Sequence, residues 1–291
     1  FARLSSEEGR GSDFHALDLE GRVAPATRRG NPRCCGLFQG LLVVSNVLLI
    51  GALIVRGSSG RAPPTLLDAD GILTVGTPGD YYPYSFVSGN GERAGIDIEL
   101  FAELASGMKA KEVRFVNTTW ASLTEGLAEG KYHVAVGGIS VTLERLLSCA
   151  FSDGYYQSGK VAVTKCGIEG GDIESLQNLI VGVNVGGTNE AFADSNLVQV
   201  RKFDRNGEQL EALLAGEVAA VVTDVEEAAW WLHTGGNNAT YCRSPAILEG
   251  TGTTKAILLP RGDNPLKRYV DFWLEQNRHF IEDLYRKYAS T

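Results

Sequence analysis

The sequence predicts an α/β protein made of two similar lobes with a cleft between them, preceded by a single N-terminal transmembrane helix. Strands and helices alternate from residue 71 onward, which is typical of mostly parallel sheets covered by helices. The alternation occurs twice, over 71–160 and 161–253, and a strand and a helix remain at 254–291. This remainder indicates that the chain crosses to a second lobe and then returns to the first.

The N-terminal region has a different character. Residues 1–35 are polar and lack an apolar period, so we expect a disordered tail. Residues 36–56 are almost uncharged and reach the length of about 20 residues that a helix needs to cross a bilayer core. Arginines are more frequent before this segment than after it, which predicts that the C-terminal part lies on the non-cytoplasmic side, whether periplasmic, lumenal or extracellular. A signal peptide and an organelle-targeting sequence are the alternatives.

After a Gly-, Ser- and Pro-containing linker at 57–70, the apolar patterns predict the elements in order. For the first lobe they predict strands at 72–76, 113–116 and 132–136 and helices at 96–108, 120–128 and 142–149. For the second lobe they predict strands at 180–183, 198–203 and 218–222 and helices that begin at residues 188, 207 and 224. The remainder predicts a strand at 255–259 and one long helix at 265–288.

Composition narrows the choice of partners. The formal net charge is −8, and the N-terminal segment is the basic part, so the two-lobed part is acidic. An acidic surface argues against nucleic acid as a partner. The four histidines have no metal-ligand spacing, and we expect neither a metal nor a cofactor. Cys166 and Cys242 could form a disulfide if this part lies in an oxidising compartment.

The segment around Glu190 is typical of an anion-binding turn. A strand ends in Gly186-Gly187, and a helix whose free N–H groups suit a carboxylate or phosphate follows. Thr188 and Asn189 are both plausible N-caps. A capping box that starts at Thr188 would place its carboxylate at position 191, which is alanine, so Glu190 is predicted to have a chemical role. The alternative is an acidic residue that merely stabilises a first helical turn.

Three further segments carry polar side chains at expected strand ends. Ser140 and Thr142 offer hydroxyl groups at a helix start, and Arg145 can bind a carboxylate through two hydrogen bonds. Asp224 follows an apolar strand, where it could hold an amino group or simply cap a helix. Trp120 could pack on a ring or belong to the core.

From about residue 73 to the end, the chain resembles the type II periplasmic solute-binding proteins, and within that fold the secreted cyclohexadienyl dehydratases. The motifs that carry the resemblance are Gly76–Tyr81, Thr119-Trp120, Ile139–Arg145, Gly186–Glu190 and Lys267–Leu274. The resemblance implies that Ser140 and Arg145 hold a substrate carboxylate, that Asp224 holds an amino group, and that Glu190 is a general acid. It implies the conversion of prephenate or arogenate to an aromatic product with loss of water and CO₂.

This chemistry requires a proton for the departing hydroxide, which is a poor leaving group. We expect Ser140, Thr142, Arg145 and the N–H groups of Thr188 and Asn189 to fix the two carboxylates of a small anionic cyclohexadienyl substrate. Glu190 would donate the proton, provided that bound anions and lobe closure raise its pKa against the helix dipole. The alternative from another class is a non-catalytic amino-acid-binding protein or receptor domain, which needs no acid at position 190.

Overall fold

A computed structural model describes residues 67, 70–262 and 265–289. The predicted tail and membrane helix at 1–56 lie outside the described residues, as does the predicted linker apart from residues 67 and 70. Within the described part, no helix combines the length and apolarity needed to cross a membrane.

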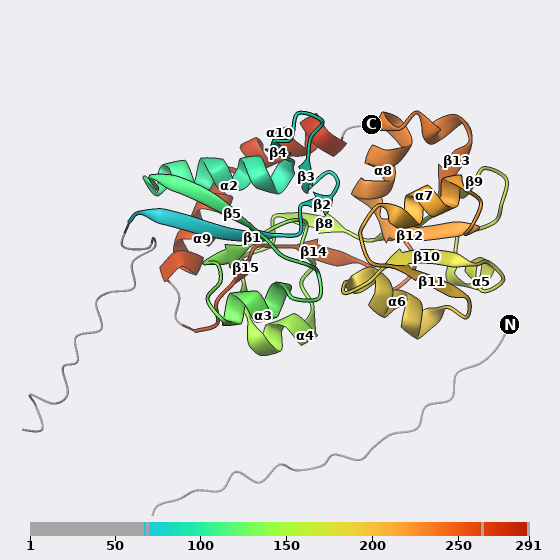
Figure 1. Ribbon diagram of the computed structural model, residues 1–291, viewed down its shortest axis with the longest axis horizontal. Coiled ribbons are helices and arrows are strands. Elements are labelled where there is room, and N and C mark those ends of the chain that lie inside the picture. The colour runs from blue at the N-terminus through green and yellow to red at the C-terminus, as the bar shows by residue number, and fades with distance from the viewer. Residues whose placement is uncertain (1–66, 68–69, 263–264, 290–291) are drawn as a thin grey trace, which may run out of the picture. The chain divides into compact units, whose positions relative to one another are not determined.

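Two five-stranded sheets form the centres of two lobes (Figure 1). The sheet of lobe 1 has the order β5-β1-β6-β15-β7, with β5 and β6 parallel to β1 and with β15 antiparallel to β6 and β7. Its strands are β1 (Ile72–Thr77), β5 (Glu112–Asn117), β6 (Val134–Ala135), β7 (Ala150–Phe151) and β15 (Leu258–Leu259).

The sheet of lobe 2 repeats this plan in the order β11-β10-β12-β9-β13. Here β10 is parallel to β11 and β12, whereas β9 is antiparallel to β12 and β13. Its strands are β9 (Lys160–Lys165), β10 (Val181–Asn184), β11 (Val200–Phe203), β12 (Ala220–Asp224) and β13 (Tyr241–Arg243). The sheets are therefore mixed, and β15 and β9, next to the crossover segments, run antiparallel to their neighbours.

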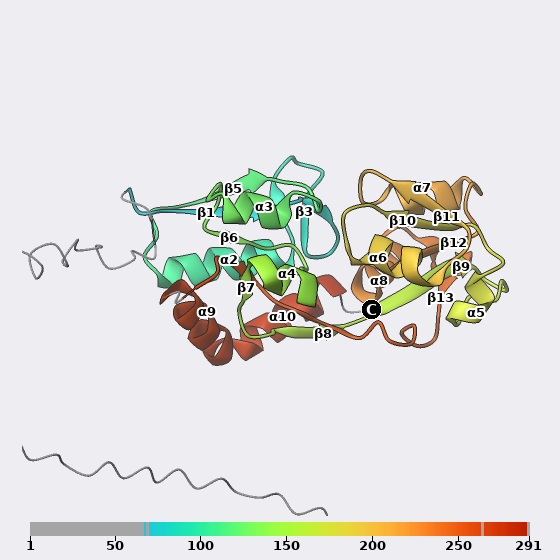
Figure 2. The same ribbon diagram turned by 90° about the horizontal axis from the view of Figure 1, so that it is seen from below.

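Helices cover both faces of each sheet (Figures 1 and 2). In lobe 1, α2 (Ile96–Gly107), α9 (Pro265–Gln276) and α10 (Arg278–Ala289) share one core, and α3 (Leu123–Ala128) packs on the other face beside α4 (Leu143–Ser148). In lobe 2, α7 (Glu208–Leu214) and α8 (Val225–Thr234) share one core with Val161, Val163 and Val221. The alternate residues Ala162, Ala220 and Val222 face α5 (Ile173–Leu176) and α6 (Thr188–Asn196).

The chain passes between the lobes through β8 (Tyr156–Ser158) and β14 (Thr253–Lys255), which pair antiparallel. A small three-stranded sheet of β2 (Asp80–Tyr81), β3 (Ser85–Val87) and β4 (Arg93–Ala94) completes lobe 1. A 3₁₀ turn, η1 (Asn237–Ala239), precedes β13.

Two predicted elements prove to be divided. The strand expected at 255–259 consists of the end of β14 and the separate β15, because the chain leaves the crossover ribbon and enters the lobe 1 sheet between them. The single helix expected at 265–288 is interrupted at Asn277, where the side-chain amide donates a hydrogen bond to the Trp273 carbonyl oxygen at 2.8 Å. An asparagine side chain that bonds the main chain in this way competes with helical hydrogen bonding.

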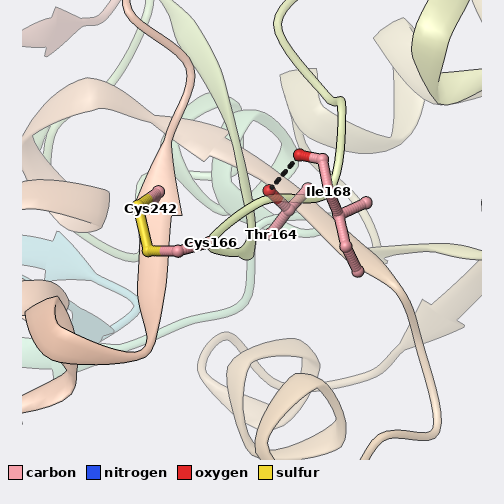
Figure 3. The surroundings of a disulfide bond; sticks show 4 residues. All are labelled: Thr164, Cys166, Ile168 and Cys242. Carbon is pink, nitrogen blue, oxygen red and sulfur yellow. Dashed lines mark hydrogen bonds between the residues drawn. A yellow bond between two sulfur atoms is a disulfide. The ribbon is translucent and has the colours of Figure 1, made fainter.

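A disulfide joins Cys166 to Cys242 and so links the end of β9 to β13 (Figure 3). The hydroxyl of Thr164, two residues earlier, donates a hydrogen bond to the main-chain oxygen of Ile168 at 3.2 Å. This bond fixes the turn that leaves the disulfide.

Candidate active site between the lobes

A small polar pocket lies between the lobes, at the carboxyl ends of the parallel strands. Only about 20 Å³ of free space remains in it, so the lobes are closed on each other. Lobe 1 contributes Tyr81, Trp120, Gly138, Ser140 and Arg145, and lobe 2 contributes Asn184, Gly187, Thr188, Asn189 and Asp224. Most of the residues predicted to bind substrate are therefore brought together here.

Asp224 is the centre of this pocket. One carboxylate oxygen accepts a hydrogen bond from the Lys160 ammonium at 3.2 Å. The other oxygen accepts hydrogen bonds from the Lys255 ammonium and, at 2.5 Å, from the Tyr81 hydroxyl. Burial alone would raise the pKa of Asp224, but the two ammonium groups outweigh it and hold that pKa well below its usual range. Asp224 is therefore ionised and already paired.

Lys160 connects Asp224 to the first turn of α6. Its ammonium donates to the Thr188 hydroxyl at 2.9 Å and to the Asn189 side-chain oxygen at 2.5 Å. The Asn189 amide in turn donates to Asn184 at 2.9 Å. Burial lowers the pKa of Lys160, and the Asp224 charge opposes that shift.

The loop before α4 positions the guanidinium of Arg145. Its Nη1 donates to the main-chain oxygen of Ser140 at 2.9 Å, while its own main-chain N–H donates to the Thr142 hydroxyl at 3.2 Å. Thr142 is thus the N-cap of α4 and does not line the pocket itself. The Ser140 hydroxyl accepts a hydrogen bond from Lys255 at 3.0 Å. The pocket region has an excess of positive charge, because the cations of Arg145, Lys160 and Lys255 outnumber the Asp224 carboxylate.

Glu190 has surroundings that differ from the prediction. The N-cap of α6 is Gly187, not Thr188, so Glu190 occupies the third helical position. Its carboxylate accepts the Gly186 main-chain N–H at 2.7 Å and pairs with Lys202 at 2.9 Å. The predicted N-caps, Thr188 and Asn189, are therefore wrong, and the Glu190 carboxylate bonds the residue before the observed N-cap.

The proton donation expected of Glu190 depends on bound carboxylates and stays a prediction. The hydrogen bond from Gly186 and the ion pair with Lys202 lower the pKa of Glu190, whereas a proton donor needs a raised one. The residue is absent from the pocket lining.

A second carboxyl group near the cleft, missed in the sequence, has a raised pKa. Glu227 follows Asp224 by one turn of α8 and is only 1% exposed. Burial, reinforced by the negative charges of Asp224 and Asp80, raises the pKa of Glu227 to about 8. Its two oxygens contact the Thr223 hydroxyl and the Asn206 amide, whose hydrogen bonds only partly oppose that shift. Both Glu227 oxygens thus accept hydrogen bonds, and Glu227, like Glu190, does not line the pocket.

Two lysines were also missed. The segment 154–160 that ends in Lys160 resembles a phosphate-binding loop, but Val161 stands where that loop needs a hydroxyl residue. The usable signal was a single lysine before an apolar run, 161–163 for Lys160 and 256–259 for Lys255. A charge in that position needs a buried partner.

Trp120 and Tyr81 form the aromatic wall of the pocket, with ring centroids 5.3 Å apart in an edge-to-face arrangement. Among the described residues, no group of three or more His, Cys, Asp or Glu side chains could hold a metal ion.

A larger groove of about 390 Å³ lies between residues 153–156 and the helices α9 and α10. Its charged side chains, such as Glu275 and Arg278, are exposed to solvent and belong to both signs. The cleft is the better candidate because its charges are buried and converge.

Comparison with known proteins agrees with this architecture. Residues 73–291 match the family model described as bacterial extracellular solute-binding proteins, family 3. The chain is 34% identical to cyclohexadienyl dehydratase of Pseudomonas aeruginosa over 76% of its own length and 84% of that protein. It is 27% identical to an L-cystine-binding protein of Escherichia coli, over 64% of this chain and 71% of that one.

A solved structure gives the same result. The crystal structure of an ancestral amino acid-binding protein, described as a precursor of cyclohexadienyl dehydratase, superposes with a TM-score of 0.68 at 30% identity, covering 75% of this chain and 96% of that one. The predicted two-lobed fold of the type II periplasmic binding proteins is confirmed. The chain belongs to family 3 of the bacterial extracellular solute-binding proteins, and it is similar to both the catalytic and the amino-acid-binding members named here.

Proposed function

We propose that the chain is a cyclohexadienyl dehydratase that converts prephenate to phenylpyruvate, water and CO₂. The observation that carries this proposal is the cationic cleft, where Arg145 lies opposite the first turn of α6 that also bears Glu190. A site that only binds amino acids needs no carboxyl group beside its carboxylate anchor. The 34% identity to a cyclohexadienyl dehydratase supports the same assignment.

The charges of the cleft favour a substrate with two carboxylates and no amino group. Arg145 lines the pocket, and the ammonium groups of Lys160 and Lys255 pair with its Asp224, so the cleft has positive charge that suits a dianion. Asp224 already receives two ammonium groups and a phenol, so a third ammonium would meet like charges in a buried site. The sequence resemblance assigns an amino group to Asp224; this pairing instead favours the keto acid prephenate over its amino counterpart arogenate.

The residues divide into binding and proton-donating groups. We assign the carboxylates to Arg145, to Ser140 and to the free N–H groups at Thr188 and Asn189, which open α6. Trp120 provides a flat surface beside the ring. Thr142 acts through Arg145, whose helix it caps.

The chemical step needs one proton. Glu190 donates it to the ring hydroxyl, so that the C–O bond breaks and water leaves. The bond to the ring carboxylate breaks as CO₂ departs, and its electron pair enters the ring, which becomes aromatic. Glu190 is left as a carboxylate and takes a proton from water before the next turnover. The positively charged cleft holds the dianion while its charge is redistributed.

In this mechanism Glu190 must take up a proton before the chemical step. Its hydrogen bond from Gly186 and its ion pair with Lys202 favour the carboxylate form. Two bound carboxylates and the exclusion of water oppose these contacts and raise its pKa.

A non-catalytic amino-acid-binding protein is the second candidate. Arg145 and Asp224 line the same cleft, and the chain is similar to binding proteins for cystine and arginine. Both observations favour this candidate. In that case the lysines would have to leave Asp224 when an amino acid binds.

We also propose that the two-lobed part lies on the non-cytoplasmic side of a membrane, held there by the apolar segment at 36–56. The disulfide between Cys166 and Cys242 supports this location, because such bonds persist in oxidising compartments.

The decisive experiment incubates the full chain with prephenate and follows phenylpyruvate by its absorbance in alkali. We expect turnover, with kcat/KM at least tenfold higher for prephenate than for arogenate. Calorimetry with arginine and cystine is the control for the second candidate. Micromolar binding of either amino acid without turnover of prephenate would overturn the proposal.

A further inference from the structure

A second space adjoins the central pocket, between the first turns of α6 in lobe 2 and the helices α3 and α4 in lobe 1 (Figures 1 and 2). It has a volume of about 330 Å³, and we call it the outer chamber. Four residues line both spaces, namely Trp120, Arg145, Gly187 and Thr188. The central pocket and the outer chamber are therefore neighbours that share a wall.

The two spaces differ in what they can hold. The central pocket has about 20 Å³ of free space, which is enough for about one water molecule. Sites that bind small organic ligands measure about 300–1,000 Å³, and the outer chamber falls within this range. Of the two spaces in the closed protein, only the outer chamber has room for a six-membered ring.

Arg145 lies at the boundary of the two spaces, with most of its hydrogen-bonding capacity unused. A guanidinium has five N–H donors. Among the described residues, the Arg145 side chain donates only to the main-chain oxygen of Ser140, at 2.9 Å, and it forms no ion pair. A guanidinium can bind a carboxylate through two parallel hydrogen bonds. A carboxylate bound in this way would lie where the central pocket meets the outer chamber, with space for the rest of the molecule in the chamber.

The walls of the outer chamber come from both lobes and combine polar and apolar groups. Thr124 and Ser148 offer hydroxyl groups from lobe 1, and the small Ala191 leaves space on the side of lobe 2. The lobes meet at one edge, where a β-carbon on Gly186 would lie 2.7 Å from the Ala121 nitrogen. Such walls suit a ring that carries a hydroxyl group, and they surround it only while the lobes are closed.

The outer chamber also accounts for the place of Glu190. The carboxylate of this residue accepts the main-chain N–H of Gly186, which lines the outer chamber but not the central pocket. Thr188 and Ala191, on either side of Glu190 in the chain, line the chamber as well. A ring hydroxyl in the outer chamber would therefore lie nearer to Glu190 than one in the central pocket.

We propose that the outer chamber is a second subsite of the cleft. It holds the ring of the substrate, while Arg145 and the first turn of α6 hold the carboxylates at its boundary with the central pocket. The subsite thereby selects acids that carry a ring over short acids. This inference rests on the proposed function for the identity of the ligand, but not for the existence of the subsite.

The first test fills the outer chamber from lobe 2. Ala191 is exposed, so Ala191→Phe and its small control Ala191→Ser should both fold. Binding is measured by NMR titration of the full chain, in a Glu190→Gln background that prevents turnover. The ligands are prephenate and pyruvate, a keto acid without the ring. We expect Ala191→Phe to weaken prephenate binding at least tenfold and pyruvate binding less than threefold, and Ala191→Ser to change neither. Equal weakening of both ligands, or of neither, would overturn the inference.

The second test fills the chamber from the opposite lobe. Ser148 is also exposed, and Ser148→Phe is compared with Ser148→Ala. The same selective loss of prephenate binding is expected, because a ring in the chamber contacts both walls. A loss in Ala191→Phe without a loss in Ser148→Phe would contradict the subsite.

A crystal structure of Glu190→Gln with prephenate shows the place of the ring directly. We expect the ring between α4 and the first turns of α6. A ligand that lies wholly in the central pocket, with the outer chamber empty, would refute the subsite.

The subsite and the proposed function can fail separately. A wild-type chain that binds prephenate without converting it would refute the proposed function, and the filled variants would still decide on the subsite. If prephenate does not bind, the variants are titrated with arginine and glycine, which differ in side-chain length. Arginine binding should then weaken at least tenfold in Ala191→Phe and glycine binding less than threefold, whereas equal changes would refute the subsite.

Discussion

Glu190 and Glu227 occupy the same position on two helices of lobe 2, yet they have opposite acid–base properties. Each is the third residue after its N-cap, and each carboxyl group reaches back to the residue before that cap. Glu190 meets a main-chain N–H and a half-exposed lysine, which lower its pKa. Glu227 meets a hydroxyl group in a nearly sealed environment, which raises its pKa. The helix dipole acts on both, so burial and the neighbouring charges decide the direction of each pKa shift.

The largest expected difference between the two glutamates is in kcat for prephenate. Glu190→Gln removes the donated proton while keeping the shape, and we expect kcat for prephenate to fall by about 10²–10⁴-fold. Glu227→Gln changes a carboxyl group outside the pocket lining and should stay within tenfold of the wild type. Calorimetric binding of prephenate to each variant is the control for an intact cleft. A greater loss in Glu227→Gln than in Glu190→Gln would contradict the assignment of the proton to Glu190.

A second comparison, between the buried Asp224 and the exposed Asp194, concerns the free energy of unfolding. Asp224→Asn leaves two buried ammonium groups without their anion, so we expect the free energy of unfolding to fall by about 3–5 kcal/mol. Urea unfolding at pH 7 measures this change. Asp194→Asn, which removes a carboxylate from the exposed ion pair with Lys202, is the matched control and should cost less than about 1 kcal/mol. Equal losses in both variants would show that burial does not determine how much these ion pairs contribute to the free energy of unfolding.

The sequence could predict features that depend on neighbours along the chain, but not those that depend on residues distant in sequence. Strand and helix periods depend on neighbours along the chain, and they predicted the two sheets and the clustering of Ser140, Arg145 and Asp224 at one cleft. Position 190 was misjudged because the N-cap lies one residue earlier than expected, which shifts the whole capping pattern. Glu227 was missed because its partners Asn206 and Asp80 are distant in sequence, and only the folded chain brings them to it.

The pH dependence of stability should follow Glu227. Its folded pKa of about 8 lies above the unfolded value, so the folded state binds the extra proton between about pH 4.5 and pH 8. Stability should therefore decrease as pH rises through this range, with a slope of at most about 1.4 kcal/mol per pH unit for this group. Urea unfolding of Glu227→Gln should show a weaker decrease, and an identical decrease would remove Glu227 as its source.

The smallest expected effect belongs to Glu190 and has the opposite sign with pH. Its lowered pKa means that its contribution is present above the unfolded pKa and is lost as pH falls through the folded one. Glu190→Ala removes the bond to Gly186 and the ion pair with Lys202, and we expect a loss of about 1 kcal/mol at pH 7 that shrinks towards zero in acid. Lys202→Met isolates the ion pair and should account for the smaller share. If the loss instead persists undiminished below pH 3, Glu190 contributes through packing rather than charge, because a protonated side chain would then stabilise α6 as well as the carboxylate does.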